Sequence, residues 1–315
     1  MYVILPRCNI TEKEKLVTNR DKKQSYLIFS VDTEHDTVGN HNTRTAGWTK
    51  GNSLLFESLD TLGMKGKVCW LIEYNIKEGI PAANPNSEYY VQELNELIEQ
   101  IKARGDELGI HPTMSDYIGS EKQISVASYN NKDLWDAERA YHDSEFVLDL
   151  ITSAVKEMKS VSGVDPIGCR TGGCQYATGL ANALEKNGVI VDSSVLRSRK
   201  QFVNSPNAYY ASGDDIRRKS TLNAGVLEIP TVSFMELNIR KPLTRIRTEY
   251  LLHLRKPVFL SLLIHNWQAI TADGEKNECF LENLNSFFSF LRNRGVCFLS
   301  WIEAKATFDS IYVTE

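Results

Sequence analysis

The stretch Ser25–Asp36, SYLIFSVDTEHD, passes from an apolar segment directly into a cluster of three carboxylates and an imidazole. Residues 25–31 have the length and composition of a buried β-strand. A strand that ends in charged residues delivers them to one edge of a sheet, where loops gather and functional residues are common. The stretch therefore predicts a sheet with a candidate site at the end of its first strand.

Segments of the same kind recur along the chain. Apolar runs of strand length lie at residues 25–31, 67–72, 107–110, 166–169, 189–191, 226–229, 258–264 and 296–300. Helical spacing of apolar residues lies at 54–62, 90–101, 134–158, 178–187 and 280–295. Asn52 and Ser53 are candidate caps of the first helix. Residues 200–223, rich in polar residues, are interpreted as a long loop.

The alternation of strands and helices predicts the fold class. Short apolar strands without strict alternation, separated by helices, are typical of a mainly parallel sheet in an α/β protein. Eight candidate strands favour closure of the sheet into a barrel. Because the chain shows no repeat and no low-complexity linker, we expect a single domain over residues 1–315, with its core at about 25–301.

Composition excludes several classes of function. The net charge is −4 over 315 residues, with both signs scattered, which argues against nucleic acid as a partner. The six cysteines show no paired CxxC spacing and are expected to be free thiols. No apolar stretch is long enough for a membrane span, and the first residues lack a signal-peptide pattern, so we expect a cytoplasmic protein.

Polar residues follow several of the predicted strands. In a parallel barrel the carboxyl ends of the strands share one face, so these residues are candidates for a common site. They are Asp32, Glu34, His35, Asp36, His111, Arg170, Asp192 and His265. Taken singly, each has a plainer interpretation as a turn residue, a helix cap or half of an ion pair.

The order of these motifs resembles the polysaccharide deacetylase family, the NodB-like carbohydrate esterases, including divergent members of the O-antigen cluster type. The motifs are Asp-x-Glu at 32–34, GDELGIH at 105–111, CRTGG at 169–173, GVIVDSSV at 188–195 and LLIH at 262–265. The resemblance covers nearly the whole chain. It implies a distorted (β/α) barrel with about seven to eight mainly parallel strands.

The resemblance also implies an activity and its partners. It implies a metal-dependent hydrolase that removes an acetyl or formyl group from the nitrogen of an amino sugar, in surface polysaccharide or O-antigen biosynthesis. The expected cofactor is a divalent metal, with zinc as the leading candidate. The expected partner is a carbohydrate: an N-acylated amino sugar, a nucleotide sugar or a glycan intermediate.

Site roles follow from the matched motif positions. Asp32 corresponds to the general base, and Glu34 and His111 to metal ligands. Arg170 corresponds to the residue that orients the base, and His265 to the general acid, with Asp192 as its support. Contacts with the substrate are expected from Trp267, Gly172 and Gly173.

Ser115 departs from the family pattern, because a second metal-binding histidine is expected there. A serine hydroxyl is a poor zinc ligand, so Asp36, His35 or Asp116 could replace it, with Ser115 itself a weaker possibility. Weak metal binding, another metal or no metal remain open. The alternatives are therefore an inactive carbohydrate-binding barrel that has lost its metal, and a deacylase acting on a non-sugar amide.

Overall fold

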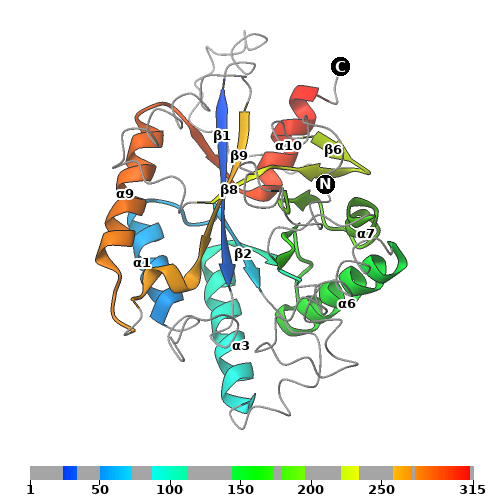
Figure 1. Ribbon diagram of the computed structural model, residues 1–315, viewed down its shortest axis with the longest axis horizontal. Coiled ribbons are helices and arrows are strands. Elements are labelled where there is room, and N and C mark those ends of the chain that lie inside the picture. Colours follow the sequence, from blue (N-terminus) through cyan, green and yellow to red (C-terminus); the bar gives the residue numbers. More distant parts are fainter. Residues whose placement is uncertain are drawn as a thin grey trace, which may run out of the picture.

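The computed structural model describes residues 24–33, 50–72, 87–112, 144–172, 179–195, 221–233, 258–271 and 274–312. Within these ranges a single sheet is covered by helices (Figure 1). Its strands are β1 (Ser25–Thr33), β2 (Val68–Ile72), β3 (Glu107–Ile110), β4 (Gly168–Cys169), β5 (Val191–Asp192), β6 (Thr221–Asn223), β7 (Val226–Glu228), β8 (Thr231–Ser233), β9 (Val258–His265) and β10 (Cys297–Leu299). Its helices are α1 (Asn52–Thr61), α3 (Ser87–Arg104), α6 (Ser144–Ser162), α7 (Leu180–Lys186), α9 (Glu278–Arg292) and α10 (Trp301–Tyr312), with the 3₁₀ helix η6 (Asn266–Ala269).

The sheet curves into a barrel because one segment pairs with two neighbours. Strands β5, β4, β3, β2, β1 and β9 lie side by side in that order, all in parallel. β7 pairs with β5, and β8, which follows after Ile229 and Pro230, pairs with β9. Residues 226–233 thus connect the two ends of the sheet. The distorted (β/α) barrel of mainly parallel strands predicted from the sequence is confirmed.

Every predicted strand is present, and two short strands were not predicted. β8 has three residues, and so does β6, which occupies the end of the segment interpreted as a loop. That interpretation is wrong at Thr221–Asn223, while residues 200–220 lie outside the described ranges. β6 pairs antiparallel with β7 across a turn at Ala224 and Gly225, whose φ angles are 47° and 80°. Glycine tolerates such angles, and the turn forces the chain back on itself.

The predicted helices are also present, with differences at their ends. α6 ends at Ser162, and residues 134–143 of the predicted helix lie outside the described ranges. The caps predicted for α1 are wrong, because Gly51 occupies the N-cap position and no side chain caps the helix. α10 was not predicted. The sequence does carry a signal for it, since Ser300 and Glu303 form a capping box in which each accepts the other's backbone N–H.

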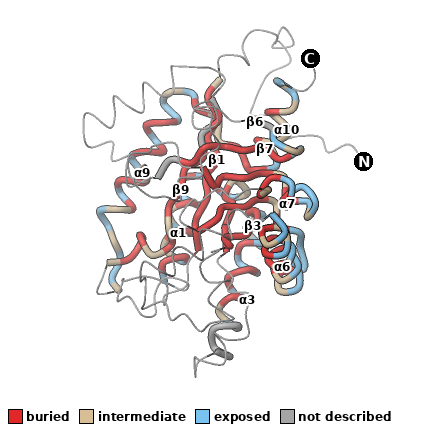
Figure 2. The backbone as a smooth tube through the Cα atoms, turned by 45° about the vertical axis from the view of Figure 1, so that its right-hand side comes forward, coloured by how far each residue is buried: buried red, intermediate tan, exposed pale blue. Residues whose placement is uncertain are grey.

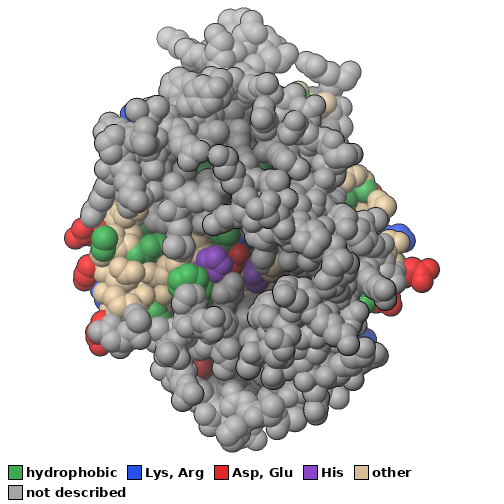
Figure 3. Space-filling view, in the orientation of Figure 1, with side chains coloured by type: hydrophobic (Ala, Val, Ile, Leu, Met, Phe, Trp, Pro, Cys, Tyr) green, Lys and Arg blue, Asp and Glu red, His purple; other side chains and the backbone are tan. Residues whose placement is uncertain are grey.

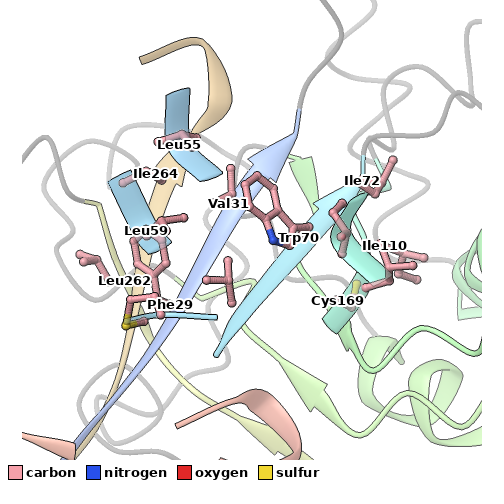
Figure 4. Packing of buried hydrophobic residues seen from close by; sticks show 14 of the residues in the cluster. Phe29, Val31, Leu55, Leu59, Trp70, Ile72, Ile110, Cys169, Leu262 and Ile264 are labelled. Carbon is pink, nitrogen blue, oxygen red and sulfur yellow. The ribbon is translucent and has the colours of Figure 1, made fainter. Parts of the chain in front are cut away.

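Alternate residues of the strands build two apolar layers. The outer layer lies between the sheet and the helices, where Leu55 and Leu59 of α1 lie over β1 and β9 (Figure 4). The inner layer fills one end of the barrel with residues such as Ile28, Leu71 and Trp301. Figure 2 shows the result, with strands buried along their length and helices exposed on their outer sides.

Two predictions from composition can be compared with these ranges. Cys69 and Cys169 are buried thiols, and none of the described cysteines, which include Cys279 and Cys297, forms a disulfide, as expected. Burial raises the pKa of both buried thiols well above the usual value, so they stay protonated. Among the described residues, no helix has the length and apolar character needed to cross a membrane.

Candidate active site

The inner face of the barrel changes from apolar to polar along the strands. On β1 the inward positions are Ile28, Ser30 and Asp32, from the apolar layer toward the carboxyl end. The same change occurs on β9, where Phe259 is followed by Ser261 and later by His265. Polar groups from several strands therefore meet above the inner apolar layer, at the carboxyl ends of the strands.

Arg170, directly after β4, is the centre of this polar region and is fully buried. Its Nη1 donates to Asp32 Oδ1 at 2.5 Å, and its Nε donates to the Ser193 carbonyl at 3.1 Å. Its Nη2 lies within hydrogen-bond distance of four hydroxyl oxygens: Ser30 (2.8 Å), Ser193 (3.1 Å), Ser261 (3.2 Å) and Thr231 (3.3 Å). We call these four residues the hydroxyl cradle.

The hydroxyl cradle was not predicted from the sequence. Its hydroxyls accept from Arg170, and three of them also donate to backbone carbonyls: Ser30 to Leu262 at 3.3 Å, Ser193 to Ile229 at 3.1 Å and Thr231 to Ser193 at 2.6 Å. Neutral dipoles thus replace water around a buried cation, whose unpaired burial would be very costly. Serine and threonine are common in strands, and nothing in their spacing marks them as partners of Arg170.

Asp32 lies between Arg170 and two imidazoles. Its Oδ1 is bound by Arg170, while its Oδ2 is 3.9 Å from Nε2 of His111 and 4.0 Å from Nε2 of His265. Asp32 and His111 are almost completely buried, whereas the His265 side chain is 23% exposed. Figure 3 shows histidine and acidic side chains reaching the surface together near the middle of one face. The segments around residues 32, 111, 170 and 265 therefore converge.

Hydrogen bonds fix the protonation of His111. Its Nδ1 lies 2.7 Å from the backbone carbonyl of Arg170. Because a carbonyl can only accept, Nδ1 must carry the proton. In the neutral ring Nε2 is then unprotonated, and its lone pair is on the side of Asp32. This is the tautomer that a metal-binding or proton-accepting histidine requires.

His265 has the opposite arrangement. Its side chain accepts the backbone N–H of Gln268, while its own backbone N–H donates to Gln268 Oε1 at 2.8 Å. The accepting nitrogen is assigned as Nδ1, because Nε2 is directed at Asp32. In the neutral ring Nε2 therefore carries the proton and is a donor. The ring also stacks on Trp267, with centroids 5.0 Å apart, beside the exposed edge of the site.

Asp192 does not reach His265 in this structure. Ser193 points inward, since it contacts Arg170, and its neighbour Asp192 points to the outer face of the sheet. Asp192 Oδ1 accepts from the N–H of Ser194 at 3.1 Å and from its hydroxyl at 2.6 Å. The buried Oδ2 has no hydrogen-bond partner among the described residues. The expected support of His265 by Asp192 is thus not seen. The sequence could not indicate which face Asp192 lies on, because β5 has only two residues.

Burial and a neighbouring carboxylate make Asp192 a weaker acid than usual. Glu228 on β7 is its register neighbour and is also buried. Burial, and next the negative charge of Glu228, raise the pKa of Asp192 from 3.8 to about 7, although hydrogen bonds from Ser194 and the charge of Arg170 oppose the shift. Glu228 was not singled out in the sequence, because its strand carries no matched motif.

Other predicted site residues are placed as follows. The N–H of Gly172 donates to the Pro112 carbonyl at 2.9 Å, so this amide is already engaged and does not face a substrate. Predicted residues that lie outside the described ranges are Glu34, His35, Asp36, Ser115, Asp116 and Gly173. No group of three potential ligands forms a complete metal site within the described ranges.

The described part of the site nevertheless fits a divalent cation. The His111 tautomer offers an unprotonated Nε2, the form of histidine that binds zinc. Asp32 Oδ2, on the residue predicted as general base, lies 3.9 Å from this nitrogen. A metal held by His111 and by ligands from other residues would therefore lie beside the carboxylate.

Solved structures resemble this chain, although no protein-family model and no curated protein matches it. A candidate polysaccharide deacetylase from Mycobacterium smegmatis has 12% identity and a TM-score of 0.59, over 91% of this chain and 90% of its own. A candidate glycoside hydrolase/deacetylase from Parabacteroides distasonis has 14% identity and a TM-score of 0.54, over 93% of this chain and 73% of its own. The chain therefore has the fold of the NodB-like polysaccharide deacetylases, as its motifs predicted.

Proposed function

We propose that this protein is a metal-dependent hydrolase that removes an acetyl or formyl group from the nitrogen of an amino sugar. The observation that carries the proposal is the position of Asp32, whose one oxygen is held by Arg170 while the other faces two imidazoles of opposite tautomer. A barrel with no catalytic site would gain no folding stability from burying this set of charged and titratable groups, because their desolvation opposes folding. The similarity of the fold to deacetylases supports the same class of reaction.

His111 would hold the cation through Nε2, with Glu34 as the expected carboxylate ligand. Asp36 or Ser115 are candidates for a further position. When bound, a divalent cation supplies a Lewis acid that polarises an amide carbonyl and lowers the pKa of water. Zinc is the first candidate, because it accepts histidine and carboxylate ligands in a site with one open position.

Asp32 is proposed as the general base. Arg170 binds Oδ1 and so leaves Oδ2 available to take a proton from the attacking water. The bond between the guanidinium and the carboxylate is a charge-assisted hydrogen bond, which is stronger than a neutral one. Since the hydroxyl cradle fixes the guanidinium, the carboxylate is oriented before the substrate enters.

His265 is proposed to assist departure of the amine. Its Nε2–H faces the same space as Asp32 Oδ2, so it can donate to the nitrogen as the C–N bond breaks. Trp267 stacks on the same imidazole and offers a flat apolar face at the edge of the site. Such a face suits one side of a pyranose ring, which supports a carbohydrate substrate. Surface polysaccharide or O-antigen biosynthesis is the context proposed for this reaction.

The test is release of acetate or formate by purified protein stripped of metal and reloaded with zinc, cobalt or manganese. Substrates should include N-acetylglucosamine oligomers, N-acetylated nucleotide sugars, N-formyl amino sugars and a simple non-sugar amide. Asp32→Asn should lower turnover by about 10²–10⁴-fold, the usual contribution of a general base. Asp106→Asn is a matched control, because Asp106 is a buried carboxylate bound to Arg104 and Trp70 away from the site.

Failure of every substrate with every metal would reject the proposal. Binding of the same glycans without turnover and without stoichiometric metal would instead identify a carbohydrate-binding barrel. Turnover restricted to the non-sugar amide would retain the hydrolase and reject the sugar.

A further inference from the structure

The peptide group between Arg170 and Thr171 is hydrogen-bonded at both of its ends. Its carbonyl accepts Nδ1–H of His111 at 2.7 Å, and its N–H donates to the Ser194 hydroxyl oxygen at 3.0 Å. The Ser194 hydroxyl in turn donates to Asp192 Oδ1 at 2.6 Å. One chain of hydrogen bonds therefore runs from the Asp192 carboxylate to the His111 imidazole, and we call it the Asp192 relay.

Every bond of the Asp192 relay points in the same direction. The imidazole donates to the peptide, the peptide to the hydroxyl and the hydroxyl to the carboxylate. Hydrogen bonds arranged in this way polarise one another, so that a negative charge at one end strengthens the acceptor at the other. Asp192, Ser194, Thr171 and His111 are all buried, so little water screens the effect.

We propose that Asp192 is a positioning residue for His111, on which it acts through Ser194 and the Arg170–Thr171 peptide. A histidine that binds metal commonly donates its second N–H to a carboxylate or a carbonyl, which fixes the ring and increases the basicity of the binding nitrogen. Here a carbonyl is the direct partner and the carboxylate stands behind it. The inference rests on the proposed function, because the proposed task of His111 is to bind the cation.

The Asp192 relay also explains why a buried carboxylate is kept on the outer face of the sheet. Asp192 has no cationic partner within hydrogen-bond distance among the described residues, and Glu228 beside it adds a second negative charge. The charged group that opposes this repulsion is Arg170, the neighbour of the relayed peptide. A structural role alone would be served equally well by a neutral side chain.

The experiment compares wild type with Asp192→Asn and Ser194→Ala at pH 8, above the pKa of about 7 of Asp192. Asparagine keeps an acceptor for Ser194 and removes the charge, whereas alanine removes the link. Ser162→Ala is the matched control, since Ser162 is another buried serine whose hydroxyl donates to a backbone carbonyl, that of Met158 at 2.7 Å. Folding of each variant is verified by its thermal unfolding transition.

Two readouts are used. In metal-free protein, ¹⁵N–¹H NMR spectra report the His111 Nδ1–H and the Thr171 amide. Both variants should shift these two signals and speed their exchange with water. Calorimetric titration with zinc should show binding about 10-fold weaker in both variants, the usual effect of losing an outer partner of a ligand. Ser162→Ala should match wild type in both measurements.

If folded Asp192→Asn has the same NMR signals and the same zinc affinity as wild type, the proposed role of the Asp192 charge is rejected. The same result in a folded Ser194→Ala would overturn the Asp192 relay itself. If wild type binds no zinc, zinc is rejected as the metal of the proposed function, and the NMR measurement alone decides whether Asp192 acts on His111.

Discussion

Glu107, the first residue of β3, accepts the backbone N–H of Trp301 at 2.7 Å, although 194 residues separate the two in the chain. Its second oxygen accepts the N–H of Ile302 at 3.0 Å. The first N–H groups of a helix have no partners within the helix, and here the carboxylate of Glu107 accepts two of them. The pair thus fastens α10 to the amino end of the barrel.

Replacement of Glu107 by alanine should therefore loosen α10. We expect a loss of about 2 kcal/mol in the free energy of unfolding, comparable to the loss of a strong helix cap. Urea denaturation followed by Trp fluorescence measures this loss. Glu278→Ala is the control, because Glu278 lies in the first turn of α9 with a largely exposed side chain. Equal effects of the two substitutions would contradict the role of Glu107.

Gly168→Ala should disturb the contact between β4 and α10. A Cβ on Gly168 would lie 2.0 Å from a ring carbon of Trp301, and the indole is fully buried. Overpacking of this kind costs about 1–3 kcal/mol. Thermal unfolding of the variant measures the cost, and the double variant Gly168→Ala/Trp301→Leu should recover part of it. No recovery would show that the strain lies elsewhere.

Loss of Arg170 should destabilise the protein strongly, because it leaves the Asp32 carboxylate buried without its cation. Arg170→Met should cost about 3–5 kcal/mol in the free energy of unfolding. Adding Asp32→Asn should restore part of this loss, with a coupling energy of about 1–3 kcal/mol. The exposed pair Lys159 and Asp165 is the control cycle, expected to give about 0–1 kcal/mol. Purely additive effects at Asp32 and Arg170 would contradict the pairing.

Asp192→Asn should change how stability depends on pH. The folded-state pKa of Asp192 is raised from 3.8 to about 7, so between these values the folded protein holds a proton that the unfolded chain has lost. The contribution of Asp192 to stability is therefore complete below pH 3.8 and is lost as the pH rises to about 7. Asparagine has no proton to lose. As the pH rises through this window, the free energy of unfolding of the variant should therefore increase relative to that of wild type by up to about 1.4 kcal/mol per pH unit. Denaturation curves from pH 4 to pH 8 that stay parallel would contradict the shift.

The strands could be predicted because burial on both faces leaves a continuous apolar run in the sequence. β6 (TLN) and β8 (TVS) were missed because each has a single apolar residue between two polar ones, so neither forms an apolar run. α10 was missed although Ser300 and Glu303 mark its beginning. Matched motifs at strand ends were enough to predict that residues 32, 111, 170 and 265 converge, because parallel strands share their carboxyl edge. Their catalytic roles stay predictions.

Other features of the site depend on contacts that sequence alone does not encode. The facing of Asp192 is set by a strand of two residues, too short for alternation to be recognised. The opposite tautomers of His111 and His265 depend on a backbone carbonyl and a backbone N–H, which every residue except proline possesses. Main-chain partners leave no mark in composition, so these properties needed coordinates.

The length of the segment that joins β7 to β8 through Ile229 and Pro230 is itself a determinant of the site. Thr231 contacts Arg170, and Glu228 lies on the opposite face of the sheet from its neighbours Leu227 and Ile229. Adding or removing one residue here would exchange the environments of acid and hydroxyl and break the pairing with β9. Proteins related to this one should therefore keep the length of residues 226–233, with hardly any insertion or deletion.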